Sequence, residues 1–176
     1  MKNLLAFGGL ALTLLFTACT KDENDDNLTA QDKAFVRDIT LSNRSEISLA
    51  NLALAKATDV SVRNFAQMMI TDHTMAETQM TEIANNIGVS RPADSLNAMA
   101  ASLMPVLMGL SGKSFDSAYI VTQIPAHDMA RSITQEEIRS GNNEQLRNYA
   151  QTMLPKIQMH LTMADTIAKR IRYPVR

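Results

Sequence analysis

The sequence contains a single cysteine, Cys19, and no tryptophan. With one thiol the chain can form no internal disulfide, and a metal site built from several thiolates is excluded as well. Glycine (6 residues) and proline (5) are scarce, which argues against a fold with many tight turns. Aromatic residues make up only 5% of the chain, whereas there are 12 methionines. This composition favours helices over sheets.

The charge balance excludes one further class of protein. Lysine and arginine total 17 and acidic residues 18, which gives a formal net charge of −1. A nucleic-acid-binding surface needs a concentrated basic face, so we expect no nucleic-acid partner. Apolar residues make up 45% of the chain and charged residues 20%, which is typical of a globular protein. The 176 residues leave room for one domain of ordinary size.

The N-terminus has the features of an export signal. A short basic end precedes an apolar stretch over residues 4–16, which is too short to span a bilayer but has the length of a signal-peptide core. The stretch ends in Leu15-Phe16-Thr17-Ala18-Cys19, which resembles a lipobox, although Phe16 stands where leucine is commoner. We therefore predict a lipoprotein signal peptide over residues 1–18 and a lipid anchor on Cys19 that holds the protein to the membrane. The alternative is an ordinary signal followed by a chance cysteine.

Residues 19–28 are predicted to form a tether behind the anchor. Four of the eight residues in 20–27 are acidic and none is apolar, so this stretch cannot pack against a core. The runs Lys21-Asp22-Glu23 and Asp25-Asp26 resemble the surface-export signal of Bacteroidetes lipoproteins. The resemblance implies an outer-membrane lipoprotein displayed on the cell surface. A generic spacer would look similar, so a domain that faces the periplasm is the alternative.

The remaining chain, residues 29–173, is predicted to form one all-α domain. Apolar residues recur at helical spacing over four long segments, about 29–57, 59–88, 114–140 and 143–173. Thr29 is expected to cap the first helix and Gly88 to end the second. The second and third segments are joined by a long connection, in which a short helix is expected over residues 93–103. Short, long and short connections predict an antiparallel four-helix bundle with one long crossover between helices 2 and 3.

An internal repeat supports this arrangement. Residues 62–69 (VRNFAQMM) and 146–153 (LRNYAQTM) are identical at five of eight positions. Each copy continues to a histidine, His73 or His160, and then to Met-Ala, with three additional residues in the second copy. The two halves of the domain thus look like a duplicated helical hairpin, the construction expected of a ferritin-like bundle. The alternative is a chance match between two amphipathic helices.

All three histidines of the sequence fall on or beside the apolar face of a different predicted helix: His73, His127 and His160. Glu46 takes a similar position on the remaining helix. A buried carboxylate needs a partner, a proton or a cation, because burying it alone is costly. A Glu/His/His/His cluster inside the domain would suit a transition metal such as Zn, Fe, Mn or Cu. The alternative is that these side chains satisfy one another by hydrogen bonds without a metal.

Two specific metal chemistries can be compared with the sequence. The di-iron site of ferritin-like proteins uses Glu-x-x-His on two helices, and no such motif exists in this chain, which disfavours a di-iron oxidase or ferroxidase. Several methionines lie within one turn of a histidine, as in Met159-His160, and thioethers suit Cu(I). Copper handling is therefore one alternative. Methionine at helical spacing is also a common filler of cores.

Four blocks of the sequence carry a resemblance to a known family: the predicted helix from Phe35 through Glu46, residues 62–69 leading to Asp72-His73-Thr74, residues 112–119 (GKSFDSAY) leading to His127, and Leu154-Pro155 leading to His160-Leu161. In these blocks the chain resembles the bacterial family that carries the domain of unknown function 4142, which is placed with the ferritin-like folds. The resemblance covers nearly the whole predicted domain. It implies the fold and export, but no activity, because the biochemical role of that family is not established.

The sequence contains no nucleophilic triad, glycine-rich phosphate loop or CxxC motif. The favoured hypothesis is an outer-membrane lipoprotein that is not an enzyme and whose helical domain binds a metal ion through Glu46, His73, His127 and His160. One alternative is a ferritin-like redox, metal-storage or copper-handling protein. A surface adhesin or partner-binding module is the other.

Overall fold

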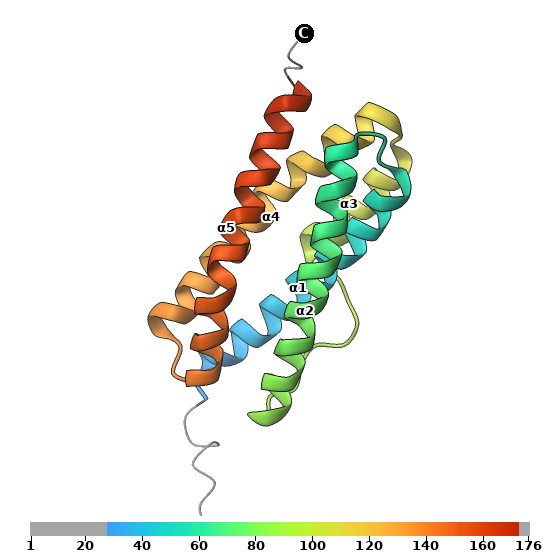
Figure 1. Ribbon diagram of the computed structural model, residues 1–176. Coiled ribbons are helices and arrows are strands. Elements are labelled where there is room, and N and C mark those ends of the chain that lie inside the picture. The colour runs from blue at the N-terminus through green and yellow to red at the C-terminus, as the bar shows by residue number, and fades with distance from the viewer. Residues whose placement is uncertain (1–27, 173–176) are drawn as a thin grey trace, which may run out of the picture.

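The computed structural model describes residues 28–172, and all regular structure in this part of the chain is helical (Figure 1). There are four long helices and one short helix: α1 (Ala30–Lys56), α2 (Val60–Asn86), α3 (Ala98–Gly109), α4 (Gly112–Ser140) and α5 (Glu144–Arg172). The prediction of an all-α domain is confirmed. The predicted signal peptide, Cys19 and the tether up to residue 27 lie outside the described residues. Within residues 28–172, no helix combines the length and apolar character that a membrane crossing requires.

The ends of the helices follow from local sequence. Thr29 and Asp32 form a capping box, in which the Thr29 hydroxyl accepts from Asp32 N (3.1 Å) and Asp32 Oδ2 accepts from Thr29 N (2.7 Å). Gly88 follows the end of α2 with φ 69°, a conformation that glycine adopts without a steric penalty. Its neighbour Val89 donates its N–H to the carbonyl of Ala84 (2.9 Å), which completes the C-terminal cap. Both predicted caps are confirmed.

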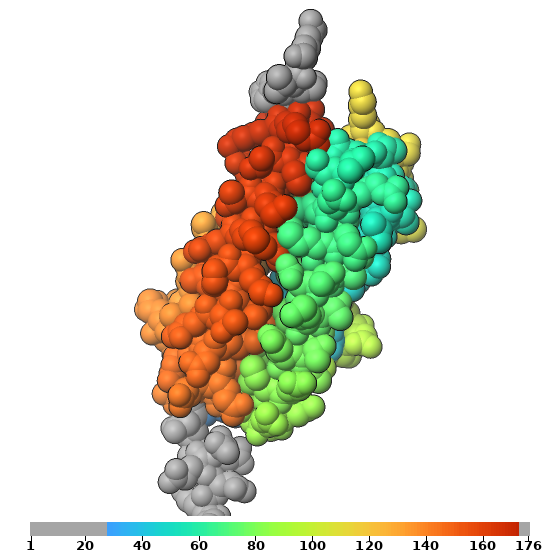
Figure 2. Space-filling view, viewed as in Figure 1, coloured from blue at the N-terminus to red at the C-terminus, as the bar shows by residue number. Residues whose placement is uncertain are grey.

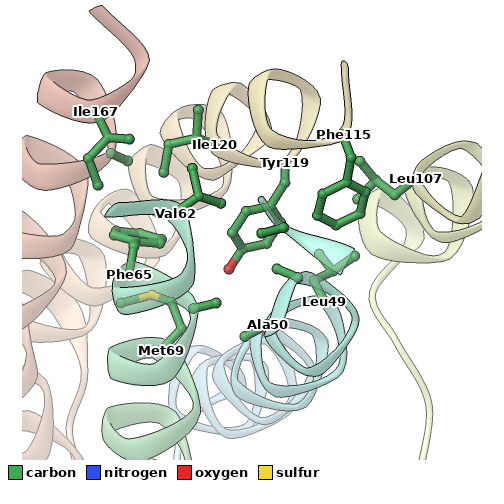
Figure 3. Packing of buried hydrophobic residues seen from close by; sticks show 14 of the residues in the cluster. Leu49, Ala50, Val62, Phe65, Met69, Leu107, Phe115, Tyr119, Ile120 and Ile167 are labelled. Atoms are coloured by element: carbon green, nitrogen blue, oxygen red, sulfur yellow. The ribbon is translucent and has the colours of Figure 1, made fainter. Parts of the chain in front are cut away.

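The long helices form two hairpins, α1 with α2 and α4 with α5, and the hairpins meet where α1 packs on α4 and α2 on α5. Two apolar clusters lie inside. The first surrounds Phe65, Met69 and Tyr119, and Figure 3 shows the Tyr119 ring in its middle with the hydroxyl directed into the cluster. The second surrounds Phe35 and Met80. Along each long helix, polar residues separate the two clusters, and this polar layer contains the candidate site.

The connection between α2 and α4 differs from its prediction. The short helix begins at Ala98 and continues past Pro105 to Gly109, whereas residues 93–103 were expected to form it. Asn97 caps the helix by accepting from Ala100 N (2.8 Å). The preceding carbonyls of Pro92 and Ala93 accept instead from the Arg44 guanidinium of α1 (2.9 and 3.0 Å). These residues lie outside the helix, and a side chain distant in sequence binds their backbone, which periodicity cannot reveal.

The two hairpins are related by a sequence offset of 84 residues. Asp32 at the start of α1 accepts hydrogen bonds from the backbone of the α4–α5 loop at Asn142 and Asn143 (2.9 and 3.0 Å). Asp116 at the start of α4, 84 residues later, accepts from the α1–α2 loop at Thr58 N and Asp59 N (2.9 and 3.0 Å). The repeat at residues 62–69 and 146–153 has the same offset. Each hairpin therefore uses one carboxylate to hold the loop of the other.

Candidate metal centre

The structure brings the three histidines together in the polar layer. His73 comes from α2, His127 from α4 and His160 from α5, and all three side chains are buried. Their ring centroids are 5.8 Å (His73 and His127), 5.6 Å (His73 and His160) and 5.3 Å (His127 and His160) apart. One nitrogen of each ring lies within 4.8 Å of the corresponding nitrogens of the other two. Three separate helices thus converge on one point.

One nitrogen of each ring is held by a hydrogen-bond acceptor. His73 Nδ1 donates to Asn43 Oδ1 of α1 (2.9 Å), and His127 Nδ1 donates to the backbone carbonyl of Gln123 (2.9 Å). His160 Nε2 donates to the Asp72 carboxylate of α2 (2.8 Å). An acceptor at one ring nitrogen places the proton there, so the other nitrogen keeps its lone pair.

The remaining nitrogens are buried, and within residues 28–172 they have no hydrogen-bond partner: His73 Nε2, His127 Nε2 and His160 Nδ1. Burial and the neighbouring imidazoles lower the pKa of His73 well below its usual value. Burial also lowers the pKa of His160 to about 4, although Asp72 opposes the shift. Both rings are therefore neutral at pH 7. Three lone pairs that face one another with no donor between them form a ready-made site for a cation.

Glu46 lies beside this group rather than within it. The carboxyl is buried on α1, and the group of mutually close ligand atoms contains only the histidines. Burial raises the pKa of Glu46, while His127 and the Gln123 side chain lower it. Glu46 in turn contributes, after burial, to the raised pKa of Tyr119. Glu46, Gln123 and Tyr119 thus form a second set of buried polar groups on the side of the site that faces the first apolar cluster.

A small cavity reaches the histidines from the seam between α2 and α5. Its volume is about 20 Å³, and its lining includes His73, His160, Asp72 and Lys156. A space of that size holds one water molecule or ion. Figure 2 shows α2 and α5 side by side on one face of the molecule, with a small hollow along the seam between them. The cavity gives the site an approach from this seam, past Asp72 and Lys156, through a lining that is mostly apolar.

The donor set limits the chemistry of the centre. Three imidazoles with an open fourth position suit Zn(II), Cu or another transition metal, and differ from the oxygen-rich surroundings of Mg²⁺ or Ca²⁺. The ligand group found in the described residues contains no carboxylate, whereas di-iron sites are bridged and flanked by several. The arrangement is therefore that of a single ion. The repeat leads to the same conclusion. Its offset of 84 residues relates His73 to Ile157 and His160 to Ala76, so the repeat does not duplicate the histidines.

Sequence reasoning found the three histidines but missed two residues that position them. Asn43 of α1 is buried and binds His73. Asn43 follows the buried Ile39 by four residues, and this spacing could have identified it. Asp72 directly precedes His73 on α2, and its carboxylate reaches His160 on the neighbouring helix.

Comparison with solved structures supports the fold. A protein described as secreted, with the domain of unknown function DUF305, from Streptomyces coelicolor superposes with a TM-score of 0.68 at 17% identity, covering 81% of this chain and 92% of that one. A DUF305 fragment from Deinococcus radiodurans superposes with a TM-score of 0.69 at 15% identity, covering 82% of this chain and 99% of the fragment. At these identities the likeness concerns the fold alone. No curated protein matches the chain.

The family is shown by sequence. The model of the domain of unknown function DUF4142 matches residues 17–167, which is most of the chain and includes all three histidines. The resemblance found in the Asp72-His73-Thr74 block and in the segments that lead to His127 and His160 is thereby confirmed, and the protein belongs to the DUF4142 family.

Proposed function

We propose that this protein binds a single transition-metal ion through His73, His127 and His160. Two observations carry the proposal: each of the three buried histidines has a ring nitrogen within 4.8 Å of those of the other two, and each has a buried ring nitrogen without a hydrogen-bond partner among residues 28–172. Asn43, the Gln123 carbonyl and Asp72 hold the opposite nitrogens, and such support is characteristic of histidines that ligate metals. A metal-free core would leave three desolvated acceptors facing one another, which is costly.

The role we propose is to hold or carry a metal ion, not to catalyse a reaction. The fourth position of a three-histidine site is open to a water molecule or an exogenous ligand. The cavity that His73 and His160 line holds one water molecule or ion but not an organic substrate. Burial raises the pKa of Glu46, and His127 is near enough to oppose this rise; we assign Glu46 to the surroundings of the ion rather than to the ligand set.

We propose in addition that the protein is exported and anchored to a membrane. The lipobox-like residues before Cys19 and the acidic residues behind it support a lipoprotein of the outer membrane, facing either the periplasm or the outside. The architecture that fits the two hairpins is a ferritin-like antiparallel four-helix bundle with its long crossover between α2 and α4. A metal-binding lipoprotein on the outer membrane would bind ions before they enter the cell.

Cobalt binding tests the site directly. Co(II) added to the chain from Thr20 onward is expected to bind in one equivalent and to give the intense visible bands of a four-coordinate ion with nitrogen ligands. His73→Ala, His127→Ala and His160→Ala should each abolish these bands. Gln158→Ala, an exposed change on the same helix as His160, is the matched control and should keep them.

Glu46→Gln separates the three-histidine site from a site with four protein ligands. We expect the cobalt spectrum to persist in this variant, since the carboxyl lies outside the ligand group. If Glu46→Gln removes binding as completely as a histidine variant does, Glu46 is a ligand. If the unaltered chain binds neither Co(II), Zn(II) nor Cu(II), the proposed function is wrong.

A further inference from the structure

The seam between α2 and α5 has a register that four contacts define. Asp59 at the start of α2 pairs with Arg170 near the end of α5 (2.6 Å), and Asp72 meets Lys156 (3.6 Å). Asp72 also accepts from His160 (2.8 Å), and the Ala76 carbonyl accepts from the Tyr149 hydroxyl (3.2 Å). As numbers rise on α2 they fall on α5, so the two helices run antiparallel. A residue one turn before Asp72 therefore lies level with residues just beyond Lys156.

The register and the helical spacing together bring three methionines to the same level of the seam. Met68 precedes Asp72 by four residues and so lies on the same side of α2. On α5, Met159 and Met163 follow Lys156 by three and seven residues, which places them on the side that Lys156 presents to Asp72. Met68 is thus opposite Met159 and Met163, one turn from the hydrogen bond between Asp72 and His160. We call these three residues the thioether group.

The thioether group lies at the surface. Met159 is 44% exposed and Met163 is 37% exposed, and Met68 is half-buried against the first apolar cluster. Of the eight large apolar side chains that are exposed in residues 28–172, five are methionines and none is leucine, isoleucine or phenylalanine. Thioethers differ from other apolar groups in being ligands, and as soft ligands they select Cu(I) and its analogue Ag(I).

We propose that Met68, Met159 and Met163 form a surface site for a soft monovalent cation, Cu(I) or Ag(I), at the seam that leads to the histidines. Binding is a ligand exchange in which three thioether sulfurs replace the ion's solvent or carrier ligands, without change of oxidation state. Passage of the ion to His73, His127 and His160 rests on the function proposed above. The surface site itself stands independently of it.

Silver provides the test, because Ag(I) is stable in air and diamagnetic. The chain from Thr20 onward, labelled with ¹³C at its methionine methyl groups, is titrated with Ag(I). The first equivalent is expected to shift the signals of Met68, Met159 and Met163. The variant Met159→Leu/Met163→Leu should bind Ag(I) about 100-fold more weakly. The control variant Met108→Leu/Met129→Leu removes two methionines of equal or greater exposure from α3 and α4, and it should bind as the unaltered chain does.

The outcomes separate the two sites. Equal loss of Ag(I) affinity in the two double variants, or shifts spread over methionines outside the thioether group, would overturn the proposal. Co(II) binding is the readout of the histidines, and both double variants should keep its spectrum, which also shows that they fold. If Ag(I) shifts the thioether group but Co(II) does not bind the chain, the surface site stands and the histidine site fails. If Co(II) binds and Ag(I) shifts no methionine signal, the histidine site stands and the surface site fails.

Discussion

His160 donates from Nε2 to Asp72 Oδ2 over 2.8 Å, from α5 to α2, and this bond turns its Nδ1 toward His73 and His127. The two residues are 88 positions apart in sequence. The contact therefore links the packing of the two hairpins to the orientation of one candidate ligand. A carboxylate behind an imidazole also raises the basicity of the ligating nitrogen.

Asp72→Ala should accordingly weaken metal binding without abolishing it. We expect a loss of about 10- to 100-fold in Zn(II) affinity, because the ring of His160 loses the acceptor that fixes its orientation. Competition with a chromophoric chelator measures this affinity. Asp165→Ala removes a carboxylate that pairs only with Lys169 on the same helix, and it should leave the affinity unchanged. Equal affinity in both variants would show that the bond to Asp72 has no role in ligation.

Metal should also stabilise the fold. Because the ligands come from α2, α4 and α5, an ion bound by all three links helices of both hairpins and binds only the folded chain. Zn(II) at 100 times its dissociation constant should raise the free energy of unfolding by about 2.7 kcal/mol. Thermal unfolding with and without Zn(II) checks this, and His160→Ala should remove the difference. A transition temperature that Zn(II) leaves unchanged in the unaltered chain would contradict the prediction.

The helices could be predicted because their information is local. Thr29 and Gly88 mark helix ends by their own backbone chemistry, and each histidine falls on a face defined by residues three or four positions away. The sequence did not show which side chains of different helices contact one another. Asn43 and Asp72 belong to the site through partners on other helices, and no spacing along the chain encodes which helices pair.

The short helix α3 shows the same limit. Its start depends on Arg44 of α1, which takes the carbonyls of Pro92 and Ala93 and also pairs with Glu77 of α2 (2.7 Å). Composition suggested a helix somewhere in this connection, but the position depends on a contact made only after α1 and α2 have packed together. Propensity yields here to tertiary structure.

Asp32 and Asp116 each hold the loop of the other hairpin by hydrogen bonds. These contacts should be among the largest single contributions to the free energy of unfolding. The two carboxylate oxygens of Asp116 accept from Thr58 N, Asp59 N and the Thr58 hydroxyl (2.6 Å). An asparagine amide has only one acceptor oxygen, and its NH2 group would face donors. We expect Asp116→Asn to lower the free energy of unfolding by about 3 kcal/mol. Asp128→Asn, on the exposed side of the same helix, is the control and should have little effect in chemical denaturation. Equal midpoints for the two variants would mean that the loop is held by other contacts.

The final prediction concerns Glu137, a buried residue in the last turn of α4. Burial, opposed by the hydrogen bond from Gln31 and assisted by the Asp32 carboxylate, raises its pKa to about 7, with a smaller opposing effect of Arg147. The pKa of Asp32 itself is lowered: burial would raise it, but the hydrogen bonds from Thr29, Asn143 and Asn142 outweigh that effect. Of the two neighbours, Glu137 is therefore the one that carries a proton at mildly acidic pH.

A carboxyl whose pKa is higher in the folded chain than in the unfolded chain stabilises the fold at low pH. Its contribution is complete below the unfolded value of 4.5 and is lost as the pH rises toward about 7. Between pH 5 and 8 the unaltered chain should thus lose about 2 kcal/mol relative to Glu137→Gln, whose amide cannot ionise. Glu136→Gln is the control, since Glu136 is half-exposed and its pKa is lowered by Arg139 and Ser140. Urea unfolding across this range decides the matter: parallel curves for the unaltered chain and Glu137→Gln would show that Glu137 is already ionised in the fold.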